Sequence, residues 1–135
     1  MISHSTDETE NEAVCFAGEL EKGDIIAFFG GLGAGKTAFI RGLAKGLGSS
    51  GFVTSPTFTI CNEYDGSPSL IHFDMYRIKT EADLESIGFY DYLEKNAIIA
   101  IEWFENISGY NITPTVTVDI ETIDENTRKI NIKKT

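Results

Sequence analysis

The sequence has few cysteines and few prolines, and these scarcities exclude several classes of protein. Cys15 and Cys61 stand far apart, with no CxxC pair and no cysteine–histidine spacing of a zinc site. A disulfide framework is therefore not expected, and a reducing cytosol fits this composition. The three prolines are scattered at positions typical of loops or the starts of strands, so they mark no linker between domains.

Long apolar runs are also absent, and basic residues are in the minority. No segment approaches the roughly 20 apolar residues that span a membrane. The N-terminal stretch MISHSTDETENE is acidic where a signal peptide requires positive charge and then an apolar core. With 21 acidic and 11 basic side chains the formal net charge is −10, which repels the backbone of nucleic acid. We therefore expect a cytoplasmic protein with no membrane association and no direct, unassisted contact with nucleic acid.

Apolar runs alternate with amphipathic segments along most of the chain. Three runs are typical of strands buried on both faces: DIIAFF (24–29), LIHFDMY (70–76) and AIIAIEW (97–103). A first helix of about three turns is predicted after Ser5, with its end at Lys22-Gly23, a second over 37–48, and a third over 80–93 that breaks near Gly88. Strands that alternate with helices imply a largely parallel sheet.

The pattern changes after Pro114. TVTVDIET (115–122) and RKINIKK (128–134) each alternate apolar and polar residues, and the DENT segment between them has turn chemistry. This predicts an antiparallel hairpin added to the edge of the sheet. The expected fold is therefore α/β, with a mostly parallel central sheet and a C-terminal antiparallel hairpin, in a single domain over 1–135.

A glycine-rich loop follows the first predicted strand. Gly30, Gly35, Lys36 and Thr37 satisfy the pattern GxxxxGK[ST], in which glycines let successive N–H groups point at phosphate oxygens. Lys36 would then reach the β- and γ-phosphates and the Thr37 hydroxyl would bind Mg²⁺. The alternative, a glycine turn with an exposed lysine, is disfavoured by the buried strand before the loop and the amphipathic helix after it. We therefore expect a three-layer P-loop NTPase fold whose nucleotide-binding residues include Gly31, Leu32, Gly33, Ala34, Gly35, Lys36 and Thr37.

Two carboxylates end predicted central strands and are candidate catalytic residues. Asp74 follows LIHF and Glu102 follows AIIAI, so both are expected at the sheet edge that faces the loop. Either carboxylate alone could instead cap a loop. The segment TSPTFTI (54–60) lies where nucleotide hydrolases place a hydroxyl that senses the γ-phosphate, so Ser55 or Thr57 is a candidate; the alternative is an ordinary turn into a strand.

Two ring residues beside these acids are expected to serve packing. Trp103 directly follows Glu102, and pleat alternation sends it to the opposite side of the strand, into the core. His72 lies in an apolar strand, where a core histidine is the commoner case, and we assign it no chemistry.

ATP is the favoured nucleotide. A GTPase carries an Asn/Thr-Lys-x-Asp motif downstream of its loop, whereas the only Lys-x-Asp here, at 22–24, lies upstream. A small-molecule kinase closes an arginine-bearing lid over the phosphoryl group, but this chain has three arginines and no segment long enough for a lid. An ATPase activated by a partner fits better, and a nucleotide-gated binding module and a kinase remain as alternatives.

Taken together, the motifs GGLGAGKT, SPTFTI, HFDMYRI, EADLESIGFYDYL and IEWFE resemble the TsaE (YjeE) family of bacterial ATPases. The resemblance covers almost the whole chain. It implies binding of ATP and Mg²⁺, slow hydrolysis of ATP by the protein alone, and action on a complex of TsaB and TsaD, where TsaD transfers the threonylcarbamoyl group to the tRNA adenosine. Contact with tRNA would then be indirect.

Carried over by position, the resemblance also implies residue roles. Lys36 cradles phosphate, Thr37 and Glu102 bind Mg²⁺, Asp74 orders the water or metal shell, Thr57 is the switch hydroxyl, and Trp103 lies beside the site. The segment around Thr9 is a candidate for the adenine pocket.

Overall fold

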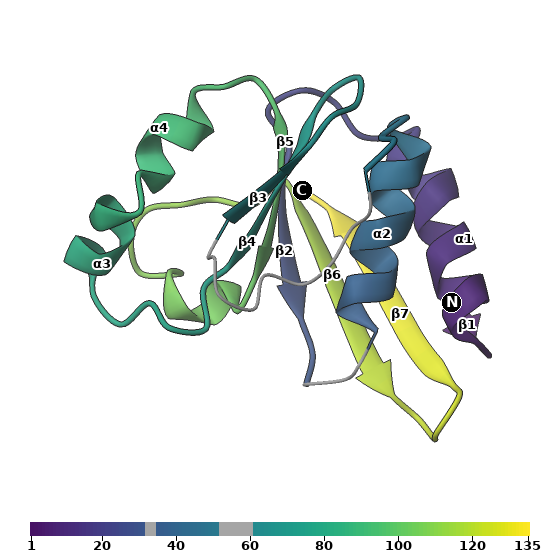
Figure 1. Cartoon of the computed structure of the whole chain (residues 1–135). Coiled ribbons are helices and arrows are strands. Elements are labelled where there is room, and N and C mark those ends of the chain that lie inside the picture. Colours follow the sequence, from purple (N-terminus) through teal and green to yellow (C-terminus); the bar gives the residue numbers. More distant parts are fainter. Residues whose placement is uncertain (32–34, 52–60) are drawn as a thin grey trace.

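The computed structural model describes residues 1–31, 35–51 and 61–135. The elements follow in the order β1 (Ile2–Ser3), α1 (Thr6–Ala17), β2 (Ile25–Phe29), α2 (Lys36–Gly46), β3 (Cys61–Tyr64), β4 (Leu70–Asp74), α3 (Glu81–Ser86), α4 (Phe89–Leu93), β5 (Ile98–Glu102), the 3₁₀ helix η1 (Phe104–Asn106), β6 (Val116–Thr122) and β7 (Arg128–Lys134). Within these residues, seven strands form one sheet in the order β1-β7-β6-β2-β5-β4-β3 (Figure 1). No helix in this part of the chain has the length and apolar character needed to cross a membrane.

The middle of the sheet is parallel. β6, β2, β5 and β4 are neighbours in that order, and each adjacent pair among them is parallel. Burial explains their central position, because every residue of β5 is buried and β2 and β4 expose only their ends in part. All four strands bring their carboxyl ends to the same edge of the sheet, where ligands bind in open parallel sheets. The expected α/β fold is confirmed.

Antiparallel strands finish both edges. β7 pairs with β6 along its whole length, which confirms the predicted hairpin, and the short β1 pairs with β7. At the other edge β3 pairs with β4. The sequence did not predict β1 or β3, because β1 has only two residues and Tyr64 is the only buried residue of β3, so no apolar alternation marks either strand.

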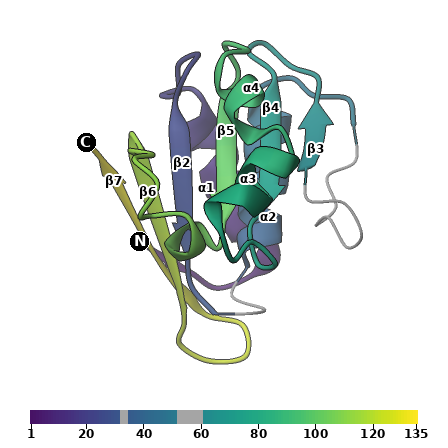
Figure 2. The same ribbon diagram turned by 90° about the vertical axis from the view of Figure 1, so that its left-hand side faces the viewer.

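Helices cover both faces of the sheet. α1 and α2 lie on one face over a core that includes Phe28, Phe39 and Leu43. α3 and α4 lie on the opposite face, in front of β4 and β5 in Figure 2, over a core that includes Phe73 and Phe89. β6 and β7 extend beyond α3 and α4, and the three layers match the expected arrangement.

Local signals explain where most helices begin. The Ser5 side chain accepts a hydrogen bond from the Glu8 N–H at the start of α1, and Thr80 and Asp83 form a full capping box before α3. Gly88, at φ 73°, separates α3 from α4 as predicted. α1 itself ends at Ala17, earlier than the predicted Lys22-Gly23, because the following N–H groups bond three residues back in tight turns.

Two glycines let α1 and α2 approach closely. A Cβ atom on Gly42 would lie 2.2 Å from the Glu10 carbonyl oxygen, and one on Gly46 would lie 2.5 Å from the Ala17 Cβ. Any side chain at these positions would separate the helices. The close contact fixes α2 against α1, and with it the position of the N-terminal end of α2.

Candidate functional site

The candidate site lies where β2 ends and α2 begins. The chain passes through Gly30 at φ 136° and Gly35 at φ 99°, angles that favour glycine, and α2 starts at Lys36. The first turn of α2 carries no acidic side chain, so the positive end of the helix dipole faces the loop without a compensating charge. Three residues of the predicted loop lie outside the described residues: Leu32, Gly33 and Ala34.

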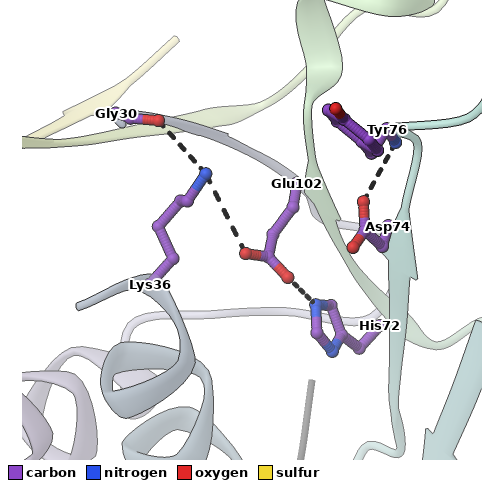
Figure 3. A network of polar contacts seen from close by, with 6 residues as sticks. All are labelled: Gly30, Lys36, His72, Asp74, Tyr76 and Glu102. Atoms are coloured by element: carbon purple, nitrogen blue, oxygen red, sulfur yellow. Dashed lines mark hydrogen bonds and ion pairs between the residues drawn. The ribbon is translucent and has the colours of Figure 1, made fainter. Parts of the chain in front are cut away.

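Lys36 is a buried cation at the centre of the site. Its side chain is only 6% exposed, although lysine normally reaches solvent. Its Nζ donates a hydrogen bond to the Gly30 carbonyl oxygen at 3.1 Å and lies 4.0 Å from Glu102 Oε1 (Figure 3). The ammonium group is therefore held over the strand ends, where the sequence predicted a phosphate site.

Glu102, the last residue of β5, joins this cation to β4. Its Cα is the register partner of Asp74, and the side chain points to the α2 side of the sheet, toward Lys36. Its Oε2 lies 2.7 Å from Nε2 of His72, which is fully buried. An ionised carboxylate only accepts hydrogen bonds, so Glu102 in that form takes this bond from an N–H of His72 at Nε2.

His72 is thus a site residue that sequence reasoning missed. The sequence predicts a core histidine with no chemistry. Its burial is confirmed, but its ring bonds Glu102, the predicted metal ligand. The signal was present in the spacing: His72 and Asp74 are two residues apart on β4 and therefore share a sheet face. What the sequence lacked was the register that places Glu102 beside them.

Asp74 is half-buried at the end of β4. Its Oδ1 accepts a hydrogen bond from the Tyr76 N–H at 2.9 Å, so the loop-capping role considered above is present. The second oxygen, Oδ2, has no hydrogen-bond partner among the residues that the structure describes. One oxygen holds the turn, and the other is left for a ligand or water.

Trp103 packs on the face that pleat alternation predicted, although its backbone leaves the strand geometry. The strand ends at Glu102, and Trp103 adopts the left-handed conformation at φ 59°, so simple pleat alternation no longer applies. The half-buried ring still packs on the α3/α4 face of the core, but Lys36 Nζ lies 5.1 Å from its centroid. The Tyr76 ring meets it edge-on at 5.0 Å. Trp103 therefore borders the cation of the site.

Two cavities adjoin these residues. One of about 540 Å³ lies beside Trp103 and is lined by Tyr76, Arg77, Lys79, Trp103 and Asn106. A smaller one, of about 120 Å³, opens at the start of α2 between the beginning of α1 and the β6–β7 turn. Its lining residues are Ser5, Thr6, Thr9, Gly35, Ala38, Glu125, Asn126 and Arg128. Thr9, the predicted neighbour of the adenine, lines the smaller cavity. Residues of the β6–β7 turn line it as well, which the sequence did not suggest.

The described residues fit a Mg²⁺ ion that binds through few protein ligands. Within residues 1–31, 35–51 and 61–135, no three His, Cys, Asp or Glu side chains form a metal-binding cluster. Mg²⁺ usually keeps several waters and binds through one or two protein ligands plus substrate phosphates. Thr37, in the first turn of α2, and Glu102, at the end of β5, carry oxygens of the kind that such a pair requires. The predicted switch residues Ser55 and Thr57 lie outside the described residues.

The arrangement and the motif order agree with a comparison against known families. The model of the family described as "Threonylcarbamoyl adenosine biosynthesis protein TsaE" matches residues 3–130. The chain belongs to the TsaE family. This confirms the resemblance drawn from the motifs.

Individual TsaE relatives align over nearly the full chain. The tRNA threonylcarbamoyladenosine biosynthesis protein TsaE of Treponema pallidum is 34% identical over 131 residues, covering 97% of each chain. Its counterpart from Rickettsia typhi is 39% identical over 134 residues, covering 97% of this chain and 92% of the relative. The crystal structure of YdiB from Bacillus subtilis superposes with a TM-score of 0.79 at 30% identity, covering 99% of this chain and 83% of that chain. The TsaE family thus connects the chain to tRNA threonylcarbamoyladenosine biosynthesis.

Proposed function

We propose that this protein binds Mg²⁺-ATP at the β2–α2 loop and hydrolyses the ATP in support of threonylcarbamoyladenosine modification of tRNA. One observation carries the proposal: the buried Lys36 ammonium lies 4.0 Å from Glu102 Oε1 at the carboxyl edge of the parallel strands. A buried cation beside a helix N-terminus attracts phosphate, and a carboxylate next to it can hold the metal.

Each residue of the site would have a separate task. Lys36 would exchange its long contact with Glu102 for phosphate oxygens, and the N-terminal end of α2 would add its dipole. Thr37 and Glu102 would hold Mg²⁺, which would supply positive charge to neutralise the phosphate oxygens. Asp74 would orient the attacking water through Oδ2, Thr57 would sense the γ-phosphate, and Trp103 would border the nucleotide.

The positions of the arginines support a proposal that a partner activates the protein. Arg41 pairs with Glu10 on α1 at 3.4 Å, and Arg128 donates to carbonyl oxygens of the β6–β7 turn. Arg77 lines the cavity beside Trp103. We propose that the TsaB–TsaD complex supplies the missing transition-state stabilisation, because arginine in trans can raise a slow intrinsic rate by about 10³ to 10⁵. The net charge of −10 favours contact with proteins over direct contact with tRNA.

Phosphate release from Mg²⁺-ATP tests the proposal, with the purified protein alone and with TsaB plus TsaD. We expect slow release alone, strong stimulation by the pair, and no stimulation with Lys36→Ala. ATP binding without any release, with or without the pair, would replace hydrolysis by nucleotide-gated binding. A phosphorylated small molecule in place of free phosphate would indicate a kinase.

A further inference from the structure

Among the residues that the structure describes, His72 is the buried side chain with a polar atom that has no partner. The residue is fully buried, and its Nδ1 has no hydrogen-bond partner among the residues that the structure describes. With Nε2 bonded to Glu102, Nδ1 is the ring's remaining polar atom, and it has no partner among these residues. An unsatisfied buried polar atom costs free energy, and an apolar side chain of similar size would avoid that cost. Core filling alone therefore does not explain a histidine here.

The geometry gives the two oxygens of Glu102 different surroundings. Oε2 is held by His72 at 2.7 Å, while Oε1 faces Lys36 at 4.0 Å (Figure 3). The short bond, between two nearly fully buried groups, fixes the rotation of the carboxylate. Without it, the longer contact with Lys36 is the one that would orient the Glu102 side chain among the described residues, and that contact would change if Lys36 binds phosphate.

We infer that His72 is a positioning residue, which holds the Glu102 carboxylate through Nε2–H so that Oε1 is presented to the metal at the nucleotide site. This inference rests on the proposed function, because it assumes that Glu102 binds Mg²⁺. Partners of this kind orient metal ligands, and their loss typically lowers metal affinity by about 10- to 100-fold. The ring itself need not touch nucleotide or metal.

Two substitutions of His72 separate positioning from packing. His72→Gln keeps an N–H donor close to the place of Nε2, whereas His72→Leu keeps the volume and removes the donor. The control is Phe73→Leu, at a fully buried position of the same strand whose side chain lies on the opposite face. The measurement is calorimetric titration of a non-hydrolysable ATP analogue at a series of Mg²⁺ concentrations, with thermal unfolding recorded for every variant.

We expect His72→Leu to raise the Mg²⁺ concentration that gives half of the metal-induced tightening by about 10- to 100-fold, close to the effect of Glu102→Gln. His72→Gln should recover most of this loss. His72→Leu removes the unsatisfied Nδ1 but leaves the buried Glu102 Oε2 without its donor, so we expect it to unfold somewhat earlier than the wild type while remaining folded at the titration temperature. Phe73→Leu should lower the unfolding temperature and leave the Mg²⁺ dependence unchanged. A loss of core packing alone would then not explain a changed Mg²⁺ dependence in His72→Leu.

Outcomes against the inference are distinct from outcomes against the proposed function. If the wild type and Glu102→Gln share one Mg²⁺ dependence, Glu102 is no metal ligand and both ideas fall. If Glu102→Gln loses the dependence and a folded His72→Leu keeps it, only the positioning role falls. Should His72→Leu not fold, His72→Asn replaces it, since its shorter side chain cannot reach Oε2: loss with Asn and recovery with Gln support the role, and equal behaviour overturns it.

Discussion

Lys36 Nζ and Glu102 Oε1 lie 4.0 Å apart, with both side chains less than 10% exposed. The two residues come from different elements, the start of α2 and the end of β5, so the contact exists only in the folded sheet. Charges that are this deeply buried stabilise each other, and removal of either one leaves the other uncompensated. The contact therefore couples Lys36, the residue proposed to bind phosphate, to Glu102, the residue proposed to bind the metal.

Substitution of the two partners should divide binding from turnover. We expect Lys36→Ala to abolish ATP binding, because the buried cation at the phosphate loop is lost. Glu102→Ala should retain much of the binding and lose the Mg²⁺-dependent turnover, because the loop holds phosphate without the strand-end acid. Calorimetric titration with ATP and phosphate release measure the two properties. Turnover that is unchanged in Glu102→Ala would overturn the metal assignment.

The sequence predicted most of the fold and the places of Lys36, Asp74 and Glu102 at the start of α2 and the ends of β4 and β5. Local patterns suffice for the parallel strands, the hairpin and the break at Gly88, because burial and turn chemistry leave their mark in neighbouring residues. The His72–Glu102 bond depends on the register between β4 and β5, and no local pattern encodes a register. The turn of the backbone at Trp103 is a tertiary effect of the same kind, since alternation predicts direction only while a strand continues.

Trp103 is the only tryptophan, and it lies 5.1 Å from the Lys36 ammonium, so its fluorescence should report on nucleotide. ATP binding should change the emission, because Lys36 turns toward phosphate and the charge near the indole moves. A fluorescence titration checks this, with Trp103→Phe as the blank. In Lys36→Ala the change should vanish; a full response there would mean that the indole senses something other than the cation.

Gly42 should tolerate no side chain. In Gly42→Ala the new Cβ would lie 2.2 Å from the backbone oxygen of Glu10, so α1 and α2 must move apart. We expect a loss of about 1–3 kcal/mol in the free energy of unfolding, the usual cost of overpacking. Gly109→Ala is the matched control, because a Cβ there meets no atom within 4 Å. Urea denaturation of both variants makes the comparison, and equal midpoints would refute the close-contact argument.

Glu10 links stability to pH. Lys45 Nζ lies 2.7 Å from its Oε1, and this hydrogen bond lowers the pKa of Glu10 below its ordinary value. Burial opposes the change, and Arg41 adds to the lowering. Because the folded-state pKa is lowered, the stabilisation is present above the unfolded-state pKa and is lost as the pH falls through the folded-state value.

The expected result is that Glu10→Gln lowers the free energy of unfolding at pH 7 by about 1 kcal/mol or less, since Lys45 is largely exposed. The difference from the wild type should shrink below about pH 4.5. Urea denaturation at several pH values measures it. Glu19→Gln removes an ion pair with Lys134 in which both side chains are at least half exposed, and it should show little effect at any pH.

Asp74 has two oxygens with two tasks, and two substitutions can separate them. Asp74→Asn keeps an oxygen that accepts from the Tyr76 N–H but removes the charge, whereas Asp74→Ala removes both. If Asp74 orients water or the metal shell, both variants should lose turnover by about 10²-fold or more. Only Asp74→Ala should also lose stability, by about 1 kcal/mol, because only that variant leaves the turn without its hydrogen bond.

Phosphate release measures the turnover of Asp74→Asn and Asp74→Ala, and urea denaturation measures their stability. Since Asp74 ends β4 beside Glu102 on β5, loss of its charge also removes repulsion between neighbouring carboxylates. ATP binding by Asp74→Asn should therefore equal or exceed that of the wild type even as turnover falls. Normal turnover in Asp74→Asn would reduce Asp74 to a turn-forming residue, and the attacking water would then have to be oriented by the switch segment or by the partner complex.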